Sequence, residues 1–167
     1  MAESVRKRSK PVERPQKART TAPRFDGLVA SSPRSSAAAR GSSRKRNTHC
    51  ELVLRRALWK RGLRYRVDVA TLPGRPDIVF PGARVVVFCD GDFWHGRDLI
   101  QRLTKLEKGH NAPYWVRKIW TNFERDRQHD RALVEVGWLV VRLWESVILR
   151  DPEAAAELIE REVKGKM

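Results

Sequence analysis

The stretch FCDGDFWHG at residues 88–96 carries the side chains of this sequence that are best suited to chemistry. An apolar run, RVVVF at 84–88, ends abruptly and is followed by Asp90, Asp92 and His95. Hard cations such as Mg²⁺ prefer carboxylate and carbonyl oxygens, and a histidine can act as general acid or base or hold a phosphate oxygen. The combination predicts metal-assisted chemistry on a phosphate.

A second carboxylate is expected at the same end of the sheet. Asp77 opens a short apolar run, DIVF, and a PGA turn joins this run to the strand that ends at Cys89 and Asp90. Two neighbouring strands joined by a tight turn form a hairpin, so the start of the first lies beside the end of the second. One or two carboxylates with a backbone carbonyl would hold Mg²⁺, which can activate a water and stabilise charge on a phosphate oxygen.

Phe93 and Trp94 follow these acids directly and would be costly to expose without a partner. Aromatic side chains beside a basic, metal-capable site suit wedging between base pairs. Simpler interpretations exist for each residue, because Asp77 can cap a turn, Asp-Gly-Asp at 90–92 is itself turn chemistry, and a lone His95 is more often structural. The two aromatics can equally belong to the core.

The hydrophobic pattern predicts a mixed α/β fold of layers. Thr48 and Glu51 form the S/T-x-x-E capping box of a first helix, and capping is the role that Glu51 has when taken alone. The two apolar strands on either side of the long helix are expected to pair in parallel. The predicted elements are a helix at 48–62, strands at 63–69, 77–80 and 84–90, an irregular segment at 96–113, a helix at 114–136, a buried strand at 138–145 and a helix at 152–164.

The chain carries 35 Lys and Arg residues against 20 Asp and Glu, and the net charge of +15 favours a polyanion such as nucleic acid as partner. Residues 1–47 hold 13 of the basic and 3 of the acidic residues and are rich in Ser, Pro and Ala. They are predicted to form a disordered basic arm that tracks DNA phosphates, ahead of a folded domain at 48–167. A solvated basic surface, a transit peptide and a misplaced start codon are the alternatives.

Other classes of protein are disfavoured by the composition. There is no apolar segment for secretion and no run of apolar residues long enough for a membrane span, so the protein is expected to be soluble and intracellular. Cys50 and Cys89 are too few for a disulfide framework or a cysteine zinc site, and each is expected to be a small buried apolar residue.

Taken together, three motifs in this order resemble the very-short-patch repair (Vsr) DNA mismatch endonucleases of the PD-(D/E)XK nuclease superfamily. They are LPGRPDIVF at 72–80, GDFWH at 91–95, and the pair YWVRKIWTNFERDR and GWLVVRLWE between 114 and 145. The resemblance covers about 48–150. It implies a restriction-endonuclease-like, three-layer core with a mixed central sheet flanked by helices. It also implies an enzyme that nicks one strand next to the T of a T·G mismatch, the product of 5-methylcytosine deamination.

The resemblance also implies a role for individual residues of this chain. Asp77 corresponds to the Mg²⁺-binding aspartate, Cys89 to the residue whose backbone carbonyl completes the metal site, and His95 to a catalytic histidine near the scissile phosphate. Glu51 corresponds to an acid that supports a metal-bound water. Phe93 and Trp94 correspond to aromatics that insert into the duplex, and the contacts expected from the arm are those of Arg40, Arg44, Lys45 and Arg46.

Three departures from the family pattern bear on mechanism and specificity. Asp90 stands where the family usually has histidine. This aspartate would provide a second metal ligand and a further catalytic carboxylate, or would change the mechanism. Asp92, Ser146 and the segment 96–98 stand where the family has zinc ligands, so no structural zinc is predicted. A methionine that joins the aromatic wedge is missing, and Arg40 falls near its place.

Two further functions therefore stand beside the mismatch endonuclease. One is a restriction or defence nuclease of the same fold without mismatch selectivity, and the other is a catalytically inactive DNA-binding module. The expected partner is double-stranded DNA, together with a cytosine-5 DNA methyltransferase system or mismatch-repair proteins. The protein is expected to be a bacterial cytoplasmic monomer, associated with the nucleoid when it acts, with Mg²⁺ as its cofactor.

Overall fold

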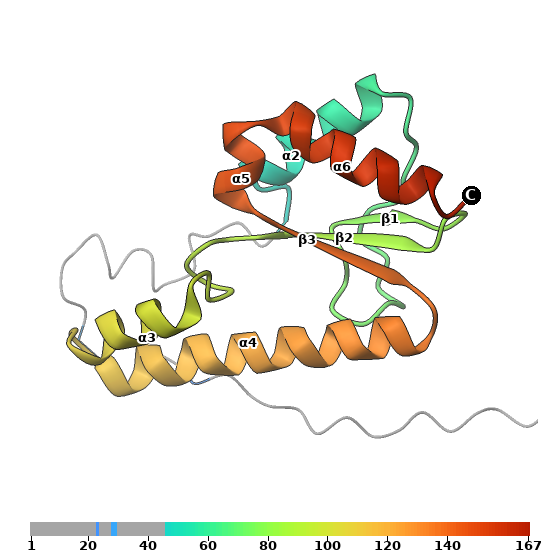
Figure 1. Cartoon of the computed structure of the whole chain (residues 1–167). Helices are drawn as coiled ribbons and strands as arrows, with labels where there is room; N and C mark the ends of the chain where they lie inside the picture. Colours follow the sequence, from blue (N-terminus) through green and yellow to red (C-terminus); the bar gives the residue numbers. More distant parts are fainter. Residues whose placement is uncertain (1–22, 24–27, 30–45) are drawn as a thin grey trace, which may run out of the picture.

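A three-stranded mixed sheet with helices on both faces forms the centre of the molecule (Figure 1). The computed structural model describes residues 46–167 together with Pro23, Leu28 and Val29. The predicted arm at 1–47 therefore lies almost wholly outside the described residues. The elements are α2 (His49–Lys60), β1 (Ile78–Phe80), β2 (Val85–Asp90), α3 (Leu99–Glu107), α4 (Ala112–Glu135), β3 (Leu139–Trp144), α5 (Glu145–Arg150) and α6 (Pro152–Lys164).

The sheet has the order β1-β2-β3, with β2 in the middle. β1 and β2 form the predicted antiparallel hairpin, in which Ile78 pairs with Val87. β2 and β3 pair in parallel from Val85 with Leu139 to Asp90 with Trp144, as predicted for two strands joined through a helix. The sequence prediction of a mixed α/β fold is confirmed.

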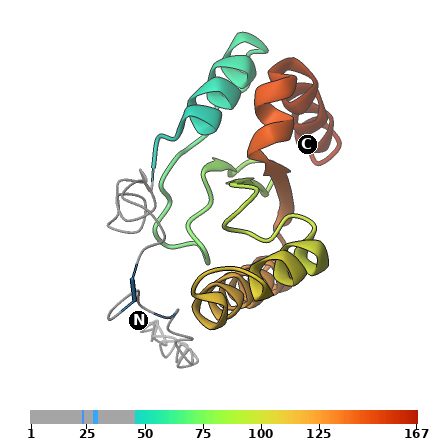
Figure 2. The same cartoon turned by 90° about the vertical axis from the view of Figure 1, so that its left-hand side faces the viewer.

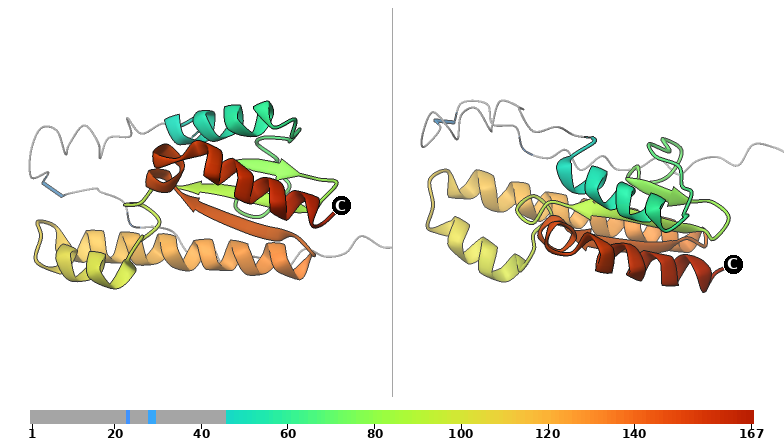
Figure 3. Two further views of the ribbon diagram at one scale, coloured as in Figure 1. Left: turned by 45° about the horizontal axis from the view of Figure 1, so that its top comes forward. Right: turned by 90° about the horizontal axis from the view of Figure 1, so that it is seen from above.

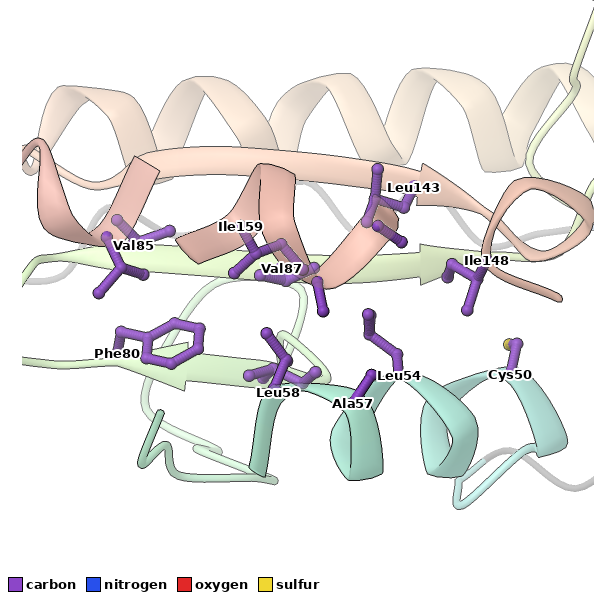
Figure 4. Packing of buried hydrophobic residues seen from close by; sticks show 14 of the residues in the cluster. Cys50, Leu54, Ala57, Leu58, Phe80, Val85, Val87, Leu143, Ile148 and Ile159 are labelled. Carbon is purple, nitrogen blue, oxygen red and sulfur yellow. The ribbon is translucent and has the colours of Figure 1, made fainter. Parts of the chain in front are cut away.

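Alternation along the strands divides the core into two layers. Ile78, Val85 and Val87 face α2, α5 and α6, where Leu54 and Leu58 of α2 meet Ile159 of α6 (Figure 4). The other face of the sheet packs against α4, and its buried residues are Val79, Val86, Phe88 and Leu133. Figures 2 and 3 show the same arrangement, with α2 and α6 side by side on one face and α4 along the other. Catalytic groups can thus reach the sheet end from two sides.

The start of α2 follows the predicted capping pattern. Thr48 is the N-cap residue, and its side chain accepts a 3.5 Å hydrogen bond from the Glu51 N–H. The Glu51 carboxylate in turn accepts from the Asn47 N–H at 3.0 Å. The first bond satisfies an N–H group that the helix leaves without an internal partner, and the second ties the residue before the N-cap to Glu51, so the position of Glu51 is set by the helix end.

Two predicted elements were wrong. The strand at 63–69 is reduced to one bridge, between Arg66 and Val79, because Asp68 adopts a left-handed backbone with φ 55° that ends extended pairing. The segment 96–113 is not irregular but contains α3, whose Leu99, Leu103 and Leu106 are partly buried at helical spacing.

The strand predicted at 138–145 is present as β3, but the expectation that it is buried was wrong. It lies at the edge of the described sheet and only Leu143 among its residues is buried. It also passes directly into α5, a helix that the sequence prediction missed. No helix among the described residues is long and apolar enough to cross a membrane.

Candidate active site at the ends of β1 and β2

Asp77 and the end of β2 meet as the hairpin requires. The Asp77 carboxylate accepts a 2.7 Å hydrogen bond from the Cys89 N–H, and the Asp77 N–H donates to the Val87 carbonyl at 3.0 Å. The pKa of Asp77 is raised from 3.8 to about 6, chiefly by burial and in part by the nearby charges of Glu51 and Asp90, while the hydrogen bond from Cys89 and the charge of Arg55 act to lower it. Among the described residues no ion pair joins the Asp77 carboxylate to a basic side chain, so its charge is the one at this sheet end that a bound cation could balance.

Glu51 reaches this sheet end from α2, where it is 4% exposed. Arg55, one helical turn later, donates to the Glu51 carboxylate at 2.9 Å and to the backbone carbonyl of Asp77 at 3.1 Å. The same guanidinium donates to the Asn47 side chain at 2.7 Å. Capping and a place beside Asp77 are thus compatible for Glu51, since the start of α2 faces the end of the sheet.

The donor set at this end fits Mg²⁺. The described residues contain no preformed cage of three or more His, Cys, Asp or Glu side chains. Mg²⁺ does not need one, because it usually keeps several waters and binds through one or two carboxylates. Asp77 and the Cys89 carbonyl would hold it directly, with Glu51 beside a metal-bound water. Burial, the main cause of the raised pKa of Asp77, disfavours the ionised carboxylate, and a bound cation would stabilise it.

His95 lies at the same sheet end, in contact with α4. Its Nδ1 atom is 2.7 Å from the Asp126 carboxylate and 3.4 Å from that of Asp90. Burial alone would lower the pKa of His95, but the hydrogen bond to Asp126 and the charges of Asp90 and Asp126 raise it above 6.5. With Nδ1 engaged in this way, Nε2 is the ring nitrogen that can exchange a proton with a substrate.

Sequence reasoning missed Asp126 and its neighbour Asn122, although both lie in a quoted motif. Asn122 is buried and donates to the Trp94 carbonyl at 3.0 Å. The signal was available, because Ile119, Asn122, Asp126 and Leu133 recur at helical spacing, so two polar residues interrupt the buried stripe of α4. Polar groups on such a stripe need partners, and the loop after β2 supplies them.

Asp90 takes part in a different set of contacts from Asp77. It is 4% exposed, and both of its carboxylate oxygens accept from Nη1 of Arg142, at 2.9 and 2.8 Å. Arg142 also donates through Nε to Asp130 on α4, at 2.9 and 3.1 Å. The prediction that Asp90 binds metal stays a prediction, and its carboxylate is already shared by Arg142 and His95.

The aromatic residues of the loop form a partly exposed cluster with α4. Phe93 stacks edge-on with Trp94 at 5.0 Å and with Trp115 at 5.7 Å, and Trp94 and Trp115 are 6.1 Å apart. Trp94 is 36% exposed, so these residues are not simply core. Trp115 was not among the predicted site residues. Of the predicted arm contacts, Arg40, Arg44 and Lys45 lie outside the described residues, and Arg46 forms an exposed ion pair with Asp68 at 2.6 Å.

Asp92 fastens the loop that carries Phe93 and Trp94. Its carboxylate accepts from the Ser146 N–H at 3.0 Å, from the Ser146 hydroxyl at 2.7 Å and from Arg97 at 2.5 Å. Burial opposes ionisation of Asp92, but the hydrogen bonds from Arg97 and Ser146 lower its pKa below 3.8. These contacts join the loop to the first turn of α5. Asp92 and Ser146 are the positions at which the resemblance implies zinc ligands in the family, and for which no zinc was predicted in this chain.

Comparison with known proteins identifies a family model and several relatives that are similar to this chain. Residues 29–101 match the family model for DNA mismatch endonuclease Vsr. The type II nicking enzyme V.NmeDIP of Neisseria meningitidis serogroup C is 38% identical over 125 residues, which are 75% of this chain and 83% of that protein. V.HpaIIP, a type II nicking enzyme of Haemophilus parainfluenzae, is 35% identical over 74% of this chain and 86% of its own. DNA mismatch endonuclease Vsr of Escherichia coli strain K12 is 38% identical over 72% of this chain and 78% of its own.

The Asp77→Asn variant is expected to be more stable than the wild type in metal-free buffer at pH 7. The pKa of Asp77 is about 6 in the folded state and 3.8 in the unfolded state, so the stability of the wild type falls as pH rises from about 4 to about 6. The loss is on the order of 3 kcal/mol, at about 1.4 kcal/mol per pH unit. Asparagine keeps an acceptor for the Cys89 N–H. Urea unfolding at pH 7 and pH 4 measures the difference, which should vanish at pH 4. A variant less stable than wild type at pH 7 would contradict a buried, uncompensated charge.

The Asp92→Ala variant is expected to lose about 1–3 kcal/mol of stability at pH 7, because three hydrogen-bond donors lose their acceptor. A lowered folded-state pKa stabilises above pH 3.8 and this contribution disappears as pH falls, so the gap between wild type and variant should narrow below pH 4. Thermal unfolding measures both. Glu107→Ala, at an exposed position of α3, is the control and should change stability by less than about 0.5 kcal/mol. Equal effects of the two substitutions would show that Asp92 does not fasten the loop.

Proposed function

The chain belongs to the Vsr family of DNA mismatch endonucleases and is a DNA endonuclease, and from this premise we propose that it uses Mg²⁺ to nick one strand of duplex DNA next to the T of a T·G mismatch. Nucleases of this family act on DNA. The observation that carries the proposal is the meeting of Asp77 and the Cys89 backbone with the His95–Asp126 pair at one sheet end. We also assign the mixed sheet to the restriction-endonuclease-like, PD-(D/E)XK class.

Each residue of the site has a part in this chemistry. Asp77 and the Cys89 carbonyl would hold Mg²⁺, which supplies positive charge against the phosphate oxygens when it is bound. Glu51 would accept a hydrogen bond from a water at this position, since its carboxylate is held beside Asp77 by Arg55. Asp126 holds the imidazole of His95 through Nδ1, so that Nε2 can pass a proton at the scissile phosphate.

The aromatic cluster supports action at a distorted base pair. Phe93, Trp94 and Trp115 form a partly exposed group on the loop and helix beside the catalytic residues. A mismatched base pair costs less to unstack than a Watson–Crick base pair, so an aromatic wedge inserts more readily at a mismatch. The Asn122 bond to the Trp94 carbonyl and the Asp92 bonds to Ser146 hold this loop in place.

A second candidate is a nicking enzyme of the same chemistry without mismatch selectivity, such as one acting with a restriction or defence system. Asp90 and Arg142 favour it, because this pair replaces the histidine expected at position 90 and so alters the surroundings of His95. A catalytically inactive DNA-binding module is disfavoured by the Asp126 partner of His95, which a binding protein has no need of. A cytosine-5 methyltransferase system or mismatch-repair proteins are the partners that the first candidate implies.

Cleavage of a labelled duplex with one T·G mismatch, beside its fully paired twin, tests the proposal. In Mg²⁺ we expect one nick next to the mismatched T, no nick in EDTA, and much slower cutting of the twin. Asp77→Asn should lower the rate on the order of 10³-fold, because the charged ligand is lost while the fold is kept.

Glu162→Ala, at an exposed position of α6, is the matched control and should nick like the wild type. Equal cutting of both duplexes would establish the second candidate instead. Binding without cutting in Mg²⁺ and in Mn²⁺ would reject both nuclease functions.

A further inference from the structure

Arg142 of β3 joins two acidic residues, Asp90 at the end of β2 and Asp130 on α4. Its Nη1 atom donates to both oxygens of Asp90 at 2.9 and 2.8 Å, and its Nε atom donates to both oxygens of Asp130 at 2.9 and 3.1 Å. The guanidinium lies 4.3 Å from the centre of the Phe88 ring. Its side chain is 22% exposed, and it sits in a strand whose neighbouring residues are apolar. A largely buried charge in an apolar strand is costly unless it is paired, so Arg142 is expected to have a role that retains it.

The register of the sheet explains why Arg142 meets Asp90. Arg142 pairs with Phe88, and Asp90 pairs with Trp144, two residues further along both parallel strands. Side chains two residues apart share a face of a strand, so Arg142, Phe88 and Asp90 all lie on the face covered by α4. Cys89 packs instead against the layer formed by α2, α5 and α6. Asp90 is thereby turned toward His95 and away from Glu51.

A continuous series of charged contacts follows from this placement. It runs from Asp130 through Arg142 to Asp90, and from Asp90 to His95 at 3.4 Å and on to Asp126 at 2.7 Å. Nδ1 of His95 therefore faces two carboxylates, one from the strand and one from the helix. Asp126 takes the short hydrogen bond, and Asp90 is a second acid beside the same ring nitrogen, so both favour the ring orientation that turns Nδ1 toward them.

We propose that Arg142 is a positioning residue for the nicking reaction, which holds Asp90 against the imidazole of His95, and that Asp90 serves His95 rather than the metal. This inference rests on the proposed function, because it concerns the same reaction at the same site. It assigns Mg²⁺ to Asp77 and Cys89 alone among the strand-end residues. It also gives Asp130, which touches neither His95 nor the metal ligands, a part in holding Arg142.

Two measurements on the full chain separate this role from a metal-binding or purely structural one. Calorimetric titration gives the affinity for Mg²⁺, and single-turnover nicking at saturating Mg²⁺ gives the rate. Arg142→Met and Asp90→Asn should each slow nicking by about 100-fold, as expected when a catalytic proton-transfer group is misplaced, and leave the Mg²⁺ dissociation constant within about twofold of wild type. Asp77→Asn is the contrasting variant and should lose Mg²⁺ binding.

Arg142→Lys is the conservative variant. A lysine ammonium can still pair with Asp90 but cannot hold Asp90 and Asp130 together as the guanidinium does, so this variant should recover part of the rate. Thermal unfolding establishes that each variant is folded. If Arg142→Met does not fold, the Lys and Asn variants decide the question.

The inference is overturned if Asp90→Asn weakens Mg²⁺ binding tenfold or more, which would make Asp90 a ligand. It is also overturned if a folded Arg142 variant nicks at the wild-type rate. A wild-type chain that nicks no duplex would instead overturn the proposed function, and the Mg²⁺ affinities would still decide whether Asp90 is a ligand.

Discussion

The rest of the site depends on the hydrogen bond between the Cys89 N–H and the Asp77 carboxylate. This 2.7 Å bond fixes a carboxylate against the last residues of β2, where the backbone leaves the sheet and its carbonyls become available. It also keeps Asp77 in a partly buried place that raises its pKa to about 6, which is unfavourable for the isolated protein. A structure retains such a group where a cation or a reaction uses it.

Two helices bring the remaining groups to this point from opposite faces of the sheet. The first turn of α2 supplies Glu51, whose direction is set by capping and by Arg55. The long helix α4 supplies Asn122 and Asp126, which hold the backbone of Trp94 and the ring of His95. The loop between β2 and α3 is thus tied to α4 and, through Asp92, to α5. A rigid loop is what an aromatic wedge and a proton-transferring histidine both require.

The parts of the site that were predictable are those encoded locally. Asp77 and Cys89 are twelve residues apart, and the apolar runs and the turn between them define the hairpin without tertiary information. Asp126 is 31 residues from His95, and its role depends on which side of α4 faces the loop. The Asp90–Arg142 contact depends on the register of two parallel strands separated by a helix.

The errors in the fold have related physical causes. The strand expected at 63–69 has the right alternation, but a left-handed residue, Asp68, stops its pairing. The leucines of α3 stand among many polar residues, so their helical spacing did not lead to a predicted helix. This helix gains its partial burial from α4 rather than from the sheet. The apolar run of β3 suggested a buried strand, whereas β3 lies at the edge of the described sheet and only Leu143 of it is buried. Tertiary packing decided the last two cases, and local backbone conformation the first.

The proposed chemistry requires a metal held by Asp77, and the most direct test is to locate that metal. Anomalous scattering from crystals of the full chain soaked in Mn²⁺, a substitute for Mg²⁺, gives its position without reference to activity. We expect one strong peak within coordination distance of the Asp77 carboxylate and the Cys89 carbonyl, with the Asp90–Arg142 pair intact. A peak bound by Asp90, or a metal elsewhere that leaves Asp77 without a ligand bond, would contradict it.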